Sequence, residues 1–89
     1  MKRSDAIVDW DDEGAPGGNT DHIADNDLDQ DEVESVLLDD GVPEEVDRSN
    51  PQYWVVRGYT FTDRWIVVVY DVLSEGPPVI RPVTAFEPD

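Results

Sequence analysis

The sequence contains no cysteine and only one lysine, and it has no long apolar run. Without cysteine, neither a disulfide nor a thiolate metal site can hold the fold together. No apolar stretch approaches the roughly 20 residues that a membrane-spanning helix needs, so we expect no association with a membrane. Residues 1–5 turn acidic without an apolar region, which argues against a signal peptide and favours a cytoplasmic location.

Positive charge is also scarce, because 22 acidic residues face only 6 basic ones and the formal net charge is −16. Three interpretations follow. Strong self-repulsion opposes collapse and favours partial disorder of the first third of the chain. Alternatively, the acidity is an adaptation to a salt-rich cytoplasm, because the Debye length falls to roughly 3 Å near 1 M salt and repulsion is then screened. The third interpretation is an acidic surface that imitates the phosphates of a nucleic acid.

The first half of the chain predicts one short strand and two helices. Residues 7–10 are typical of a strand, and a helix capped by Asn19 or Thr20 should end at Asn26. Asp29 and Glu32 form a capping-box pattern at the start of a second helix. The apolar stripe of that helix consists of Val33, Val36 and Leu37. We expect Gly41 to terminate the helix.

The second half predicts three antiparallel strands over residues 53–60, 64–70 and 79–86. The middle run is continuously apolar, so we expect a central strand that is covered on both faces, followed by a turn at 73–78. Together these elements define an α+β fold, with a short N-terminal strand and two helices on one face of a three-stranded meander. A single domain spans 1–89, with a core over about 7–86 and flexible segments at 11–18 and 42–51.

Candidate site residues are few. There is no Gly-rich phosphate loop, no zinc-ligand spacing and no nucleophile elbow, and the acidic segments lack the ligand spacing of a calcium loop. We therefore predict no metal and no small-molecule cofactor. His22, the only histidine, is either a packed helix residue or a general base. Arg57, Arg64 and Arg81 lie on the three long strands, where they either pair with surface carboxylates or form an anion site.

The order and spacing of several short motifs resemble the BrnT family of small toxins from type II toxin–antitoxin pairs. These motifs are Trp10-Asp11, His22-Ile23-Ala24, Asp31-Glu32-Val33 with Val36, the run from Thr62-Asp63-Arg64 to Tyr70, and Ile80-Arg81-Pro82-Val83-Thr84-Ala85. The resemblance covers about residues 7–86 and implies a RelE-like fold, ribonuclease activity, an RNA substrate and an antitoxin partner. On this resemblance Arg64 and Arg81 match family arginines and would bind phosphate, while His22 or Tyr70 would transfer protons.

Two groups of basic residues that are usual in the family are replaced here. The end of the first helix has Asp25, Asn26 and Asp27 in place of a basic residue, a histidine and a glycine, and Phe86-Glu87-Pro88 stands where arginines are usual. RNA cleavage needs positive charge to hold phosphate and stabilise the transition state. The sequence thus leaves three functions open: a ribonuclease toxin, a non-catalytic acidic module that binds a protein, and a mimic of nucleic acid.

Overall fold

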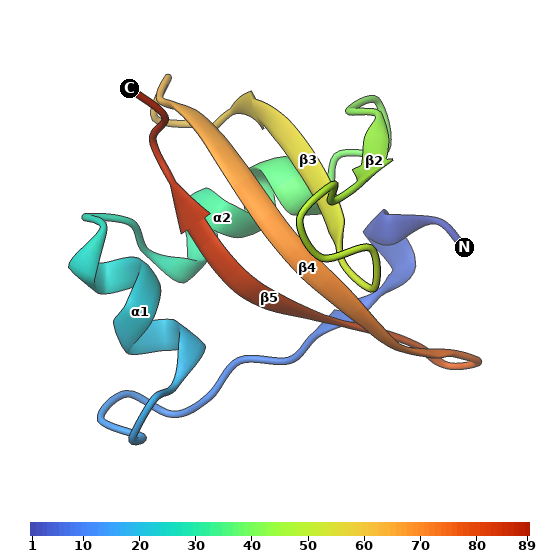
Figure 1. Cartoon of the computed structure of the whole chain (residues 1–89), viewed down its shortest axis with the longest axis horizontal. Helices are drawn as coiled ribbons and strands as arrows, with labels where there is room; N and C mark the ends of the chain where they lie inside the picture. The colour runs from blue at the N-terminus through green and yellow to red at the C-terminus, as the bar shows by residue number, and fades with distance from the viewer.

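The computed structural model describes all residues 1–89 as two short helices on one face of a five-stranded sheet (Figure 1). This arrangement confirms the α+β class. The elements are a 3-10 turn at Arg3–Asp5, β1 (Ile7–Val8), α1 (Asn19–Asp25), α2 (Gln30–Leu37), β2 (Glu44–Val46), β3 (Trp54–Tyr59), β4 (Trp65–Glu75) and β5 (Pro78–Phe86).

The strand order is β1-β5-β4-β3-β2, and only the β1–β5 pair is parallel. Strands β3, β4 and β5 are successive antiparallel neighbours, but the sheet has two more strands than the predicted meander because β1 joins one edge and β2 the other. Strand β2 lies inside the segment 42–51 that was expected to be a connector. All three of its residues are exposed, so it has no alternating apolar pattern from which it could be predicted.

Strand β4 is the centre of the sheet and is longer than predicted. It continues through residues 71–75, and the connection to β5 is reduced to Gly76 and Pro77. The polar residues and prolines of 73–78 are typical of a turn, which is why the sequence places the end of the strand too early. Two register shifts against β5, at Val69/Tyr70 and Val72/Ser74, let the long strands remain paired.

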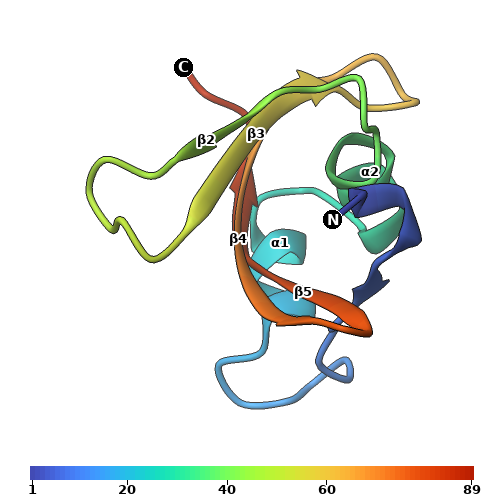
Figure 2. The ribbon, with the colours of Figure 1, turned by 90° about the vertical axis from the view of Figure 1, so that its right-hand side faces the viewer.

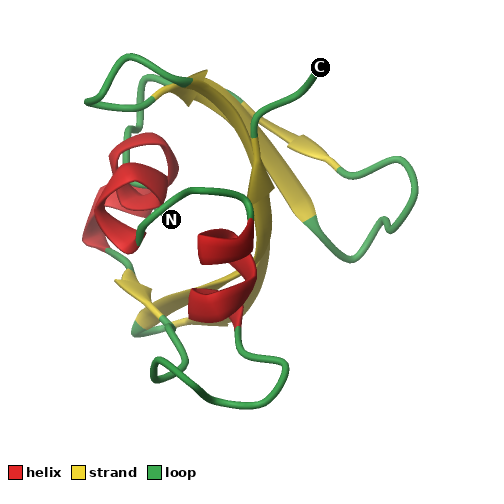
Figure 3. Cartoon of the chain, turned by 90° about the vertical axis from the view of Figure 1, so that its left-hand side faces the viewer, coloured by secondary structure: helices red, strands yellow, loops and turns green.

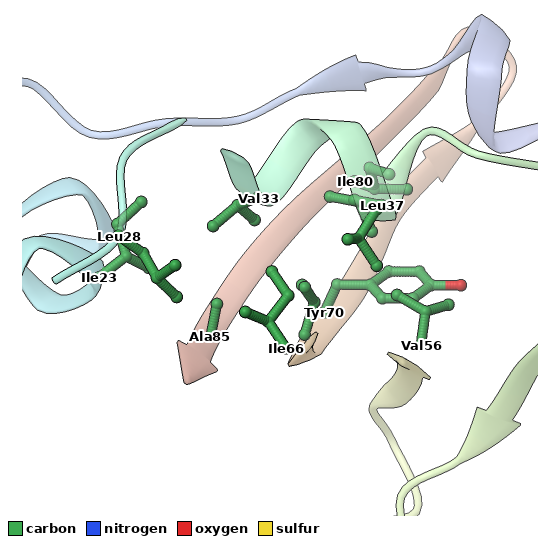
Figure 4. Close-up of a cluster of buried hydrophobic side chains, with 11 residues drawn as sticks. Ile23, Leu28, Val33, Leu37, Val56, Ile66, Tyr70, Ile80 and Ala85 are labelled. Carbon is green, nitrogen blue, oxygen red and sulfur yellow. The ribbon is translucent and has the colours of Figure 1, made fainter. Parts of the chain in front are cut away.

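The core lies between the helices and one face of β4. Ile66, Val68 and Tyr70 on that face are fully buried, against the stripe of α2 and Ile23 of α1 (Figure 4). The prediction that β4 is covered on both faces is wrong, because both helices lie inside the curve of the sheet and leave its other face open (Figure 3). Val67 on the open face is 7% exposed because its cross-strand partners, Arg57 and Phe86, flank it.

The capping box of α2 is confirmed, since the Asp29 side chain accepts from the Glu32 amide and Glu32 reaches back to the Asp29 amide. The helix ends at Leu37 rather than near Gly41. Buried Arg3 binds this end of the helix, where its guanidinium donates to the carbonyls of Leu37 (2.8 Å) and of residues 39 and 42. These bonds hold the carbonyls that follow α2 in a tight turn.

Helix α1 starts at Asn19, but Asn19 is not its cap; the N-cap is Gly18, without a side-chain bond. The Asn19 amide instead donates to the carbonyls of Asp9 (3.0 Å) and Pro82 (2.9 Å), and so joins α1 to the chain after β1 and to β5. The predicted end of the helix at residues 26–27 is confirmed, with Asn26 as C-cap and Asp27 in the left-handed region at φ 63°.

Candidate functional site on the open sheet face

The face of the sheet opposite the helices, which we call the outer face (Figure 2), carries Arg57 and Arg81 of the five candidate residues. Its cross-strand rows are Tyr59 with Trp65; Arg57 with Val67 and Phe86; Val55 with Val69 and Thr84; and Asp71 with Arg81. The rows run from an aromatic end, through valines, to a polar end. Val55 and Val67 in the centre are only 6% and 7% exposed, so they offer little apolar surface to a partner.

The polar end contains a shallow hollow of about 430 Å³. His22 of α1 reaches it beside β5, with Nε2 2.8 Å from Thr84 Oγ1. Arg81, Asp71 and Tyr53 also line the hollow. The structure therefore brings together His22 and Arg81, two of the five predicted site residues, although they are 59 positions apart in the chain.

The Arg81 guanidinium is already occupied by carboxylates of this chain. Its Nη2 lies 2.6 Å from Asp11 Oδ2, and its Nη1 lies 3.1 Å from both Asp11 Oδ1 and Asp9 Oδ2. The pair with Asp11 is bidentate, the geometry with which arginine also binds phosphate. The hydrogen bond from Arg81 is the main cause that lowers the pKa of Asp11, and the same bond raises the pKa of Arg81.

Arg64 lies at the opposite end of the sheet, where it joins three segments. It donates to Glu32 of α2 (3.1 Å), to the carbonyl of Asp27 and to Glu87 after β5. Glu32, which is 7% exposed, also accepts from the hydroxyl of Thr62 at 2.6 Å. That hydroxyl contributes most to the lowered pKa of Glu32, and Arg64 adds to it. Arg64 is thus part of the network that holds the start of α2.

The other two predicted residues lie outside the hollow as well. Arg57 is on the outer face and pairs with Glu45 at 2.8 Å, in an exposed contact that contributes little to stability. Tyr70 is in the core, with a fully buried ring and a hydroxyl that donates to Glu44. Burial, followed by the hydrogen bond to Glu44, raises the pKa of Tyr70. Loss of its proton is therefore disfavoured, and its ring does not reach the hollow.

Two features are not predicted from the sequence. Buried Arg3 lies 34 residues or more from its partners, so no local spacing reveals its role. The aromatic end of the outer face carries Tyr59 and Trp65, whose ring centroids are 4.9 Å apart in an edge-to-face contact. The alternation of side chains along β3 places Tyr59 on the same face of the sheet as Arg57. The register between β3 and β4 places Trp65 on that face as well. The alternation of residues along β3 could therefore have predicted the face on which Tyr59 lies.

The fold and this face define a small α+β protein with an open, mixed aromatic and polar sheet surface. Comparison with protein-family models, with curated proteins and with solved structures finds no match for the chain. No group of three histidine, aspartate or glutamate side chains is arranged to hold a metal ion. Neither helix has the length and apolar character required to cross a membrane.

Proposed function

We propose that the chain is a BrnT-like protein with a RelE-like arrangement, which binds a protein partner and has lost the ribonuclease activity of that family. The order of the motifs at His22, Arg64 and Arg81 supports the kinship. One observation carries the loss of activity: the guanidinium groups of Arg57, Arg64 and Arg81 are all paired with carboxylates of the chain.

The pairing matters because an RNA phosphate would have to compete with carboxylates that are already in place. At Arg81 it would have to displace a bidentate aspartate and would then face Asp9 and Asp71 nearby. Four of the six basic residues form ion pairs, and the net charge remains −16. Added salt screens the overall repulsion, but it also weakens the phosphate contacts on which RNA affinity depends.

A ribonuclease is the second candidate, and the hollow at the polar end favours it. His22 and Arg81 both line this hollow, and the imidazole is exposed and bonded to the Thr84 hydroxyl. Histidine is the side chain whose ordinary pKa best suits proton transfer near neutral pH. In this candidate His22 transfers the proton and Arg81 holds the phosphate, after its release from Asp11.

Expression of the chain in a bacterial host, with and without the protein encoded by the adjacent gene, distinguishes the two candidates. We expect no growth arrest, no cleavage of RNA by the purified chain at low or high salt, and a stable complex with the adjacent gene's product. Growth arrest and RNA cleavage that both disappear in His22→Ala and Arg81→Ala would overturn the proposal in favour of the ribonuclease. Asp25→Ala, an exposed change on the same helix, is the control.

A further inference from the structure

The aromatic patch, defined as Tyr59, Trp65 and Phe86, lies at the aromatic end of the outer face. The three side chains are 65%, 44% and 37% exposed. Tyr59 and Trp65 are direct cross-strand partners, and Phe86 is the partner of Val67, two residues along β4 from Trp65. Diagonal neighbours at this spacing are within reach of aromatic side chains, so Phe86 extends the surface formed by Tyr59 and Trp65.

The patch is exposed to solvent, and both helices lie on the opposite side of the sheet (Figure 2). Exposed aromatic side chains that gather on a sheet face are typical of surfaces that bind a partner. Tryptophan and tyrosine also contribute more binding free energy than most residues at protein interfaces. Tyr59 and Trp65 are therefore the expected centre of contact.

Charge decides which partner fits. Carboxylates border the patch: Asp63 lies exposed in the β3–β4 turn, and Glu87, which pairs with Arg64, follows Phe86. Glu45, further along the outer face, is already paired with Arg57, so the preference for a cationic partner depends mainly on Asp63 and on the net charge of −16. A second copy of this chain would bring another net charge of −16 against these groups, so self-association through the patch is disfavoured. A nucleic acid is repelled for the same reason.

We propose that the aromatic patch binds a segment of a partner protein that is rich in arginine or lysine. Guanidinium or ammonium groups of the segment lie over the rings of Trp65 and Tyr59, where the face of an aromatic ring attracts a cation. Neighbouring cations of the segment pair with the exposed Asp63, and its apolar side chains cover Phe86. This inference rests on the proposed function as a protein-binding module, and it names the chemistry of the partner.

The test uses a labelled ten-residue peptide in which arginine and leucine alternate, and measures its affinity for the full chain by fluorescence anisotropy. A glutamate–leucine peptide of the same length is the charge control. Trp65→Ser should weaken binding of the arginine peptide about tenfold. Leu73→Ser is the matched control variant, because Leu73 is 49% exposed on the same strand and its replacement leaves the net charge unchanged. It should bind the peptide like the wild type.

Each other outcome overturns the inference. Equal binding by wild type and Trp65→Ser would mean that the peptide responds only to the overall negative charge. Comparable binding of the glutamate peptide would remove the role of the bordering carboxylates, and a concentration-dependent dimer would identify a second copy as the occupant. Thermal unfolding verifies that both variants are folded, with a somewhat lower midpoint expected for Trp65→Ser because it loses the contact with Tyr59.

The failure of this inference is distinguishable from failure of the proposed function. If the complex with the adjacent gene's product forms and is unaffected by Trp65→Ser, the patch is not the docking site, while the protein-binding function stands. If no such complex forms and the chain cleaves RNA, the proposed function itself fails, whatever the peptide does.

Discussion

Replacement of Glu32 by glutamine tests whether the network around Arg64 is structural. The Glu32 carboxylate accepts from Thr62 Oγ1 (2.6 Å), Arg64 Nη1 (3.1 Å) and the Asp29 amide (3.3 Å). Glutamine keeps the size of the side chain but has one oxygen and no charge. Hydrogen bonds that involve a charged group contribute about 1.5 to 3 kcal/mol. We therefore expect Glu32→Gln to lower the free energy of unfolding by about 2 kcal/mol at pH 7.

For a domain of this size, such a loss lowers the midpoint of thermal unfolding by about 8 to 16 °C. The effect should depend on pH. The pKa of Glu32 is lowered in the folded chain, so its ionised form stabilises the fold above the ordinary glutamate pKa of about 4.3. That contribution is lost as the pH falls through the lowered pKa, because the protonated carboxyl then resembles the glutamine amide. The difference between wild type and variant should shrink from about pH 5 towards about pH 3.

The assay is thermal unfolding followed by circular dichroism, at several pH values and one salt concentration. Asp31→Asn is the matched control, because Asp31 is exposed in the same first turn of α2 and loses the same charge. It should change the midpoint by no more than about 3 °C. An equal effect of the two substitutions, or a difference between wild type and Glu32→Gln that does not change with pH, would refute the structural role of the network.

Three further predictions concern the core, the paired arginine and the overall charge. Tyr70→Phe should cost only about 1 kcal/mol in urea unfolding, since it removes one hydrogen bond to Glu44 and keeps the buried ring; a loss similar to that of Ile66→Ala, about 3 kcal/mol, would contradict this. A double-mutant cycle of Arg81→Ala and Asp11→Asn, measured by thermal unfolding, should give less destabilisation for the pair than the sum of the single changes; additive effects would mean that the two side chains are not coupled. Raising KCl from about 0.1 to about 2 M should raise the unfolding midpoint, as expected for a chain adapted to salt; a fall would argue against that adaptation.

The parts of the fold that local patterns encode were predicted from the sequence. The capping box at Asp29, the end of α1 at Asn26 and the buried middle of β4 each depend on neighbours a few residues away. Strand β2 was not predicted because it is an exposed edge strand, whose position depends on pairing with β3 rather than on its own side chains. The open second face of β4 was missed because an apolar run does not reveal how many layers cover it.

The candidate site was harder to predict than the fold. The sequence singles out the strand arginines because positive charge is scarce, but it leaves open whether they bind an anion or pair within the chain. Their partners lie far away in the sequence: Asp11 is 70 residues from Arg81, and Glu32 is 32 residues from Arg64. Only the folded chain shows that these carboxylates occupy the guanidinium groups.

Binding of a labelled RNA oligonucleotide to the purified chain tests the central claim most directly, because that claim states that the strand arginines are not free to hold phosphate. The measurement is made by fluorescence anisotropy at about 0.1 M salt, where phosphate contacts are strongest, with wild type and Arg81→Ala side by side. We predict no saturable binding by either protein. Saturable binding by the wild type that is lost in Arg81→Ala would contradict the account.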